Sequence, residues 1–267
     1  MPATSKESVH FQEITIQYGE VEAKVAPARG ALVSALRVGD QQVLFLDRAT
    51  FEDQTRNVRG GIPVLFPYAG KLDGGRLKAS GSEMGQHGFG RNRAWEVKEQ
   101  KSWRVRMALL PEESDIGAYP FNFAAEQSCT VLPRGLQVEL CIFNSGEKAM
   151  PVSPGWHPYF SCPGEKKGRL TCSVPGVNSS QFSNDREFDF GLVAPANGRA
   201  QFEIPRLGPV TLSFSPEMRH LQFWSQPGID FVCLEPFTGP NNTINTDERI
   251  DILPGCAHTF WMRIELD

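Results

Sequence analysis

His157 is suited to acid–base chemistry by its type and by its neighbours in this 267-residue sequence. It lies in the segment SPGWHPYF (153–160), where the following Pro158 favours an extended backbone at the histidine. An imidazole held in an aromatic setting suits general acid or base work near neutral pH. The rings of Trp156 and Tyr159 suit stacking on the apolar face of a sugar. The alternative is a core histidine whose ring bonds a backbone carbonyl.

Glu235 is the second candidate for acid–base chemistry, because it stands in the apolar segment FVCLEPF (231–237). A carboxylate in such surroundings is costly to bury unless it is paired or functional. Its type and position favour a general base or a nucleophile at a strand end. The alternative is a buried ion pair with an arginine. A glycosidase would need a second, facing carboxylate, and Asp230 is the only acidic residue near it in the sequence.

Two glycine-rich segments add polar side chains. Arg59 precedes paired glycines in RGGIPVLFP (59–67), where the backbone can approach a ligand closely and the guanidinium can bind an anionic or polyhydroxyl group. His87 and Arg91 stand four residues apart in a second segment, with two glycines between them. The alternatives are a turn with a solvated arginine and a surface histidine.

No metal or organic cofactor is expected. His10, His220 and His258 are isolated from one another, and the six cysteines form no C-x-x-C pair. The acidic residues of segment 247–251 lack the spacing of a calcium loop and indicate a solvated turn. Neither a phosphate-binding glycine loop nor a nucleophile elbow occurs.

Charge and hydropathy favour a small-molecule partner and a cytoplasmic location. The net charge of −4 argues against nucleic-acid binding, which needs a basic face. Residues 1–10 contain no apolar run typical of a secretion signal, and no stretch approaches the roughly 18 apolar residues that span a bilayer. We therefore expect neither a nucleic-acid nor a membrane partner. The choice between a monomer and a dimer stays open.

The elements that position these residues are predicted to be strands. Apolar and polar residues alternate with a period of two at 14–18, 136–142, 210–214 and 260–266. Turn dipeptides separate such segments, and no apolar helical pattern persists over three turns. The prediction is an all-β protein, a large antiparallel β-sandwich formed by one domain over residues 1–267, with the C-terminal strand paired into a sheet.

An ordered set of motifs carries a family resemblance. The set comprises VRGGIPVLFP (58–67), HGFGRNRAW (87–95), YPFNF (119–123), PVSPGWHPYF (151–160), CLEPFTGPNN (233–242) and ILPG (252–255). In this order the motifs resemble the aldose 1-epimerase (mutarotase) superfamily, and more narrowly its hexose-6-phosphate mutarotase branch. The resemblance implies the galactose mutarotase-like supersandwich fold, which agrees with the strand prediction.

The resemblance also implies a cofactor-free mechanism. Glu235 matches the family's general base, which takes the proton of the anomeric hydroxyl, and His157 matches the general acid, which protonates the ring oxygen. The ring then opens, the aldehyde rotates, and closure gives the other anomer. The two groups would act as an ionised carboxylate and a charged imidazole, a pair that mutual attraction favours.

Substrate-binding residues follow from the same resemblance. Arg59 and Arg91 match the arginines that hold the phosphate in the hexose-6-phosphate branch. His87 matches a histidine near the sugar and is a second donor, and Asp185 matches a sugar-binding carboxylate. The run Tyr68-Ala69-Gly70-Lys71-Leu72 departs from this branch, which usually has Trp and Phe here, and is more similar to members that act on free sugars. Two alternatives therefore stay open, a free glucose or galactose epimerase and a non-catalytic carbohydrate-binding protein.

Overall fold

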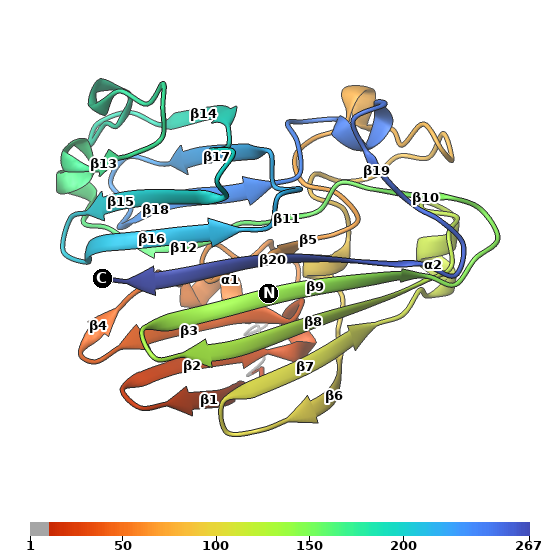
Figure 1. The fold of residues 1–267 in the computed structure, drawn as a ribbon, viewed down its shortest axis with the longest axis horizontal. Coiled ribbons are helices and arrows are strands. Elements are labelled where there is room, and N and C mark those ends of the chain that lie inside the picture. The colour runs from red at the N-terminus through yellow and green to blue at the C-terminus, as the bar shows by residue number, and fades with distance from the viewer. Residues whose placement is uncertain (1–10) are drawn as a thin grey trace, which may run out of the picture.

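A computed structural model describes residues 11–267, so the expectation that residues 1–10 carry no secretion signal lies outside the described residues. The fold is built almost wholly of strands (Figure 1). Every pairing between these strands is antiparallel, as the alternating sequence pattern predicts. The predicted large antiparallel β-sandwich is confirmed.

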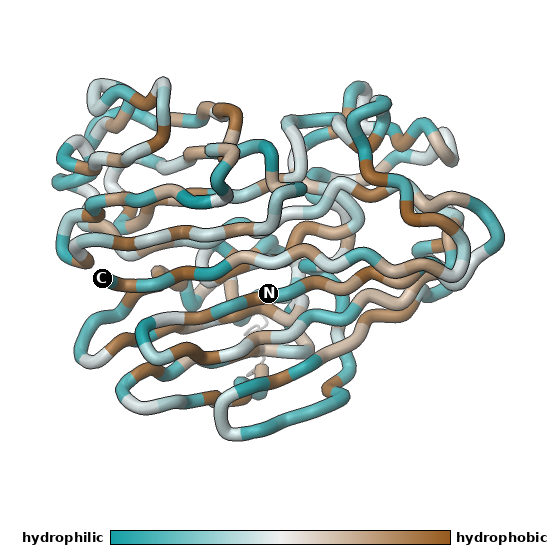
Figure 2. Tube along the Cα trace, viewed as in Figure 1, coloured by the Kyte–Doolittle hydropathy of each residue, from teal (hydrophilic) through white to brown (hydrophobic). Residues whose placement is uncertain are grey.

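The largest sheet has eight strands, and the C-terminal strand lies inside it. In spatial order its strands are β13 (Thr171–Cys172), β15 (Arg199–Ile204), β16 (Gly208–Phe214), β20 (Ala257–Leu266), β9 (Gly135–Asn144), β8 (Phe123–Leu132), β7 (Arg104–Leu109) and β6 (Glu96–Gln100). Hydrophobic and hydrophilic residues alternate along the long strands (Figure 2). The apolar residues of β9, β16 and β20 that were predicted to face inward are buried.

Two smaller sheets cover the large one. The six-stranded sheet contains β14 (Phe188–Val193), β17 (His220–Ser225), β18 (Phe231–Phe237), β11 (Gly155–Trp156) and β5 (Val64–Leu65) in that order, with β12 (Tyr159–Ser161) also paired to β18. The four-stranded sheet contains β1 (Ile14–Tyr18), β2 (Val21–Ala26), β3 (Leu32–Val38) and β4 (Gln41–Gln42). β1 and β2 pack on β8, whereas Phe223 of β17 meets Phe202 of β15.

The remaining elements are short. β10 (Met150–Val152) pairs with β19 (Ile250–Ile252). The helices of the described residues are α1 (Arg48–Glu52), α2 (Glu113–Ile116) and six short 3₁₀ segments, η1 (Pro27–Arg29), η2 (Asp73–Gly75), η3 (Gly90–Asn92), η4 (Gly164–Arg169), η5 (Ser179–Gln181) and η6 (Thr243–Asn245). None of the helices described within residues 11–267 has the length and apolarity to cross a bilayer.

One prediction about β1 is wrong in detail. Ile16 is buried, but Tyr18, which shares its face, is 55% exposed. Tyr18 is the last residue of an edge strand and lies beside the turn at Gly19. Elsewhere, one hydrophobic cluster runs from Ile16 to Leu266 and fills the space between the sheets.

The six-stranded sheet separates this core from a polar surface. Leu221, Phe223 and Leu234 belong to the hydrophobic cluster. The alternate positions of the same strands, including Gln222, Trp224 and Glu235, line a pocket on the other face.

Candidate active site

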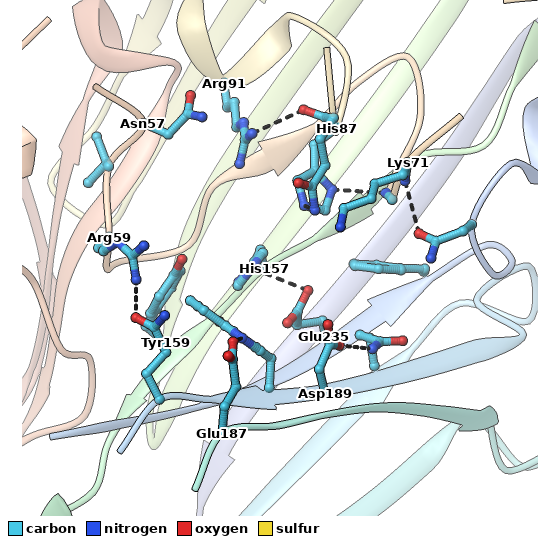
Figure 3. A pocket seen from close by; sticks show the side chains of 18 residues that line it. Asn57, Arg59, Lys71, His87, Arg91, His157, Tyr159, Glu187, Asp189 and Glu235 are labelled. Atoms are coloured by element: carbon cyan, nitrogen blue, oxygen red, sulfur yellow. Dashed lines mark hydrogen bonds and ion pairs between the residues drawn. The ribbon is translucent and has the colours of Figure 1, made fainter. Parts of the chain in front are cut away.

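The pocket on the six-stranded sheet has a volume of about 390 Å³ and gathers the acid–base candidates (Figure 3). Its lining combines polar side chains from sheet strands with loops that lie far apart in the sequence. The lining residues are Asn57, Val58, Arg59, Gly70, Lys71, Gln86, His87, Arg91, His157, Tyr159, Glu187, Asp189, Gln222, Trp224, Gln226, Glu235, Phe237 and Asn241.

Strand register brings His157 opposite Glu235. Gly155 pairs with Phe237, and Tyr159 pairs with Cys233, on opposite sides of the histidine. Antiparallel register keeps the sum of paired residue numbers constant, so His157 must face Glu235. The Nε2 atom of His157 lies 3.4 Å from Oε2 of Glu235. Both residues are deeply buried, His157 being 7% and Glu235 2% exposed.

Burial sets the protonation of this pair and corrects the expected ion pair. Loss of solvent and, to a lesser extent, the positive charge of Arg91 lower the pKa of His157 to about 3. Burial likewise raises the pKa of the Glu235 carboxyl well above its usual range; Asp189 adds to this rise, and Arg91 opposes it. Both shifts favour the neutral imidazole and the protonated carboxyl over the ion pair, because desolvation disfavours each charged form. The neutral pair and the ion pair contain the same number of protons; in the neutral pair, the proton that an imidazolium would carry is on the carboxyl of Glu235.

The imidazole of His157 is held by its surroundings as well as by Glu235. The ring of Tyr159 stacks on it in parallel, with centroids 4.6 Å apart. The backbone N–H of His157 donates to the carbonyl of Pro63. Its Nδ1 atom is buried and has no hydrogen-bond partner among the described residues. The stacked ring of Tyr159 and the backbone hydrogen bond thus fix the imidazole in place.

His87 also lies in the pocket, with its ring centroid 5.7 Å from that of His157. Its Nδ1 accepts a hydrogen bond from the backbone N–H of Gly70, which leaves the proton of a neutral ring on Nε2. Burial lowers the pKa of His87 well below its usual value, and Arg91 adds to this effect. The lowered pKa favours a neutral ring, and its Nε2 lies 3.0 Å from the side-chain amide nitrogen of Gln86.

Arg59 and Arg91 meet in the same pocket although they lie in different loops. Arg91 donates from Nη2 to the carbonyl of Gln86 at 3.0 Å, and its Nε is buried without a partner in the described chain. Arg59 is exposed at the rim, where it donates to the side-chain carbonyl of Gln226 and lies 5.7 Å from the ring of Trp224. The two guanidinium groups form a cationic end of the pocket.

Asp185, expected as a sugar ligand, does not line this pocket. It lies in an exposed turn and borders a separate, open depression with Glu165 and Asp230. Besides Glu235, the acidic residues that line the pocket are Glu187 and Asp189, at the start of β14. Because side chains alternate along a strand, residues 187 and 189 share the pocket face, whereas Phe188 is buried on the other face.

Hydrogen bonds hold these two carboxylates. Asp189 accepts from the side-chain amide of Gln222 at 2.5 Å, and Glu187 accepts from the indole of Trp224 at 2.7 Å. The alternation EFDF (187–190) was the signal that could have identified both residues.

Trp156 also lies away from the expected position. It is 0% exposed, and its indole donates to Gln127 within the core. Trp224 and Tyr159 line the pocket instead and supply its aromatic surface.

One group of possible metal ligands occurs among the described residues. Donor atoms of His157, Cys233 and Glu235 lie within 4.8 Å of one another, and all three residues are buried. The positive charge of Arg91 acts on both His157 and Glu235 and opposes a bound cation. The arrangement is better suited to moving a proton between His157 and Glu235 than to holding a metal.

Comparisons with known proteins agree with this geometry. Residues 12–186 match the family model of aldose 1-epimerase. The uncharacterized protein YphB of Escherichia coli (strain K12) is 23% identical over 244 residues, covering 76% of this chain and 82% of that protein. A "Putative glucose-6-phosphate 1-epimerase" of Salmonella typhimurium is 31% identical over 155 residues, covering 55% of this chain but only 48% of the relative.

Solved structures share the whole fold. The crystal structure of the Slr1438 protein from Synechocystis sp. PCC 6803 has a TM-score of 0.89 and 28% identity, covering 99% of both chains. A galactose mutarotase related enzyme from Lactobacillus acidophilus has a TM-score of 0.78 and 17% identity, with 96% of this chain and 97% of that chain covered. The latter likeness shows the fold alone. Since the family model spans more than half of the sequence, the chain belongs to the aldose 1-epimerase family and is an epimerase.

Proposed function

We propose that this protein interconverts the α and β anomers of a hexose 6-phosphate by opening and reclosing the sugar ring. The observation that carries the proposal is the 3.4 Å contact between His157 and Glu235 in a pocket that also holds Arg59 and Arg91. The pair supplies an acid and a base, and the two arginines supply forked donors that suit a phosphate. Residues 1–267 would act as a single domain.

In the proposed reaction, Glu235 as a carboxylate takes the proton of the anomeric hydroxyl. His157 as an imidazolium donates its proton to the ring oxygen, the bond from C1 to that oxygen breaks, and an aldehyde forms. Rotation about the C1–C2 bond exposes the other face of the aldehyde. The ring oxygen then attacks C1 and returns its proton to His157, while Glu235 returns the other proton to the anomeric oxygen.

A proton would have to move from Glu235 to His157 before ring opening, because burial favours the neutral forms of both groups. Arg91 disfavours the imidazolium of His157 but favours the carboxylate of Glu235. A phosphate bound to Arg91 would offset that charge and raise the pKa of both groups, so contacts with the sugar itself would have to favour the transfer.

A free hexose is the second candidate substrate, and the pair Glu187 and Asp189 favours it. Carboxylates bind sugar hydroxyls well but repel a phosphate. These two side chains line the pocket from β14, below Glu235 in the view of Figure 3. The proposed function uses them as ligands for the ring hydroxyls, away from the phosphate.

The test is the relaxation of freshly dissolved α-glucose 6-phosphate and α-glucose to anomeric equilibrium, followed by NMR with wild-type protein. The proposal predicts a value of kcat/KM for the phosphosugar at least about tenfold above that for glucose, the scale of one charge-assisted contact. Equal values would support the free-hexose alternative. Acceleration of neither sugar would refute the proposed reaction.

A further inference from the structure

Lys167 is a buried cation to which the proposed reaction assigns no role. It belongs to η4 (Gly164–Arg169) and is 0% exposed, whereas the adjacent Lys166 is exposed. Its ammonium lies 5.5 Å from the centroid of the Phe231 ring. Within residues 11–267, no carboxylate lies within 4.0 Å of it, and Asp230 acts on its charge from farther away. A lysine is rarely buried without an ion pair, so this placement needs a physical reason.

Lys167 forms a hydrogen bond with a residue that lines the pocket next to Arg59. Its ammonium donates to the backbone carbonyl of Gln226, which lines the pocket in the connection between β17 and β18. The side-chain carbonyl of the same Gln226 accepts the hydrogen bond from Arg59. Gln226 therefore accepts a hydrogen bond from Lys167 at its backbone carbonyl and one from Arg59 at its side-chain carbonyl.

Two further contacts hold the connection between β17 and β18 to the segments that carry Lys167 and Arg59. Gly164, in the same 3₁₀ segment as Lys167, donates to the carboxylate of Asp230 at 2.8 Å, which ties η4 to the start of β18. On the other side, the guanidinium of Arg59 lies over the ring of Trp224, two residues before Gln226. The position of Gln226 thus decides where the guanidinium of Arg59 is held.

We infer that Lys167 is a positioning residue for the phosphate end of the pocket. It fixes the backbone of Gln226, and Gln226 in turn orients the guanidinium of Arg59 toward the bound phosphate. The inference rests on the proposed phosphosugar function and extends it beyond the residues that touch the substrate. It assigns Lys167 to recognition of the phosphate, and it predicts no effect on the chemical step at His157 and Glu235.

The test compares Lys167→Met with wild-type protein on glucose 6-phosphate and on glucose. Methionine keeps the apolar stem against Phe231 and removes the charged donor. We expect KM for the phosphosugar to rise about tenfold, the scale of one lost charge-assisted hydrogen bond, with kcat within about twofold. Both constants for glucose stay unchanged. Lys166→Met, at the adjacent exposed lysine, is the matched control and should change the kinetic constants for neither substrate.

A conservative variant and a double variant separate positioning from a general structural role. Lys167→Gln keeps an N–H donor but is shorter and uncharged, so it should restore part, but not all, of the lost affinity. It also serves if the methionine variant does not fold. In Gln226→Ala the side-chain link to Arg59 is already cut, so adding Lys167→Met should raise KM no further. A circular dichroism melt of each variant checks folding.

The outcomes distinguish the inference from the function on which it rests. If wild-type protein treats both sugars alike, the phosphosugar function fails, whatever the variants do. If wild-type protein prefers the phosphosugar and a folded Lys167→Met or Lys167→Gln protein keeps that preference in full, the positioning role of Lys167 is refuted. Equal losses on glucose and on glucose 6-phosphate would also refute it, because they would show a general structural role.

Discussion

Replacing Glu235 with glutamine should make the protein less active and more stable. The substitution keeps the size of the side chain, so the packing around a residue that is 2% exposed is preserved. The amide cannot take a proton from the anomeric hydroxyl. Its N–H₂ group can donate to the neutral Nε2 of His157, which lies 3.4 Å from Oε2 of Glu235 in the wild type.

The expected loss of activity follows from the role of a general base. Removing such a group costs about 10²–10⁴ in rate, which corresponds to roughly 3–5 kcal/mol of the activation free energy. KM should change little, because the amide occupies the same volume beside the sugar. The assay is anomer relaxation of glucose 6-phosphate by NMR at several substrate concentrations.

The expected gain in stability follows from the direction of the pKa shift. Burial raises the pKa of Glu235 in the folded state, so the folded protein binds more protons than the unfolded chain above the unfolded value. Stability therefore falls as pH rises from the unfolded pKa toward the folded one. Glutamine has no charged form, so the variant avoids the cost of burying a carboxylate. The Tm of Glu235→Gln at pH 7 should therefore exceed that of the wild type. A variant that keeps wild-type rates, or that melts lower at pH 7, contradicts this reasoning.

Three further predictions concern stability and binding. Burial lowers the pKa of His157 to about 3, so wild-type stability should fall as pH drops below the unfolded value of about 6.5, and His157→Asn should flatten that fall in acid melts. Arg59→Ala should raise KM for glucose 6-phosphate about 10- to 100-fold and leave glucose kinetics unchanged. A Cβ on Gly30 (φ +77°) would lie 2.1 Å from the carbonyl oxygen of Arg91, so Gly30→Ala should lower Tm and weaken phosphosugar binding. The control is Gly19→Ala, whose Cβ would have no atom within 4 Å and which should leave phosphosugar binding intact.

The fold was predictable because the alternation of apolar and polar residues directly encodes which face of a strand is buried. The apolar residues of β9, β16 and β20 are buried as their sequence patterns predict, and Thr211, on the opposite face of β16, is buried as well. The order of the strands in the sheets, and the way two smaller sheets share one large partner, depend on contacts between distant segments. No local pattern specifies those contacts.

The pocket was predictable in its central pair but not in its full lining. His157 and Glu235 attracted notice because a polar group interrupts an apolar segment. Consecutive strand residues face opposite sides, so a pocket-facing His157 requires Trp156 to face the core, and the sugar-stacking role expected for Trp156 conflicts with that rule. The same rule would have identified Glu187 and Asp189.

The protonation of the central pair could not be read from the sequence. Attraction between opposite charges favours a carboxylate and an imidazolium, whereas the observed burial favours their neutral forms. Burial of these two side chains results from the register of β18 against β11 and β12 and from the loop that brings Arg91 over the pocket. Each of these is a tertiary contact.

Two-dimensional exchange NMR on glucose 6-phosphate and glucose, side by side with wild-type protein at neutral pH, tests the proposed function most directly. Cross-peaks between the two anomeric protons report the exchange rate at equilibrium, with no coupling enzyme. We predict fast exchange of the phosphosugar, slower exchange of glucose, and loss of both in Glu235→Gln. Exchange of glucose 6-phosphate at the uncatalysed rate would contradict the roles proposed for His157, Glu235 and the two arginines.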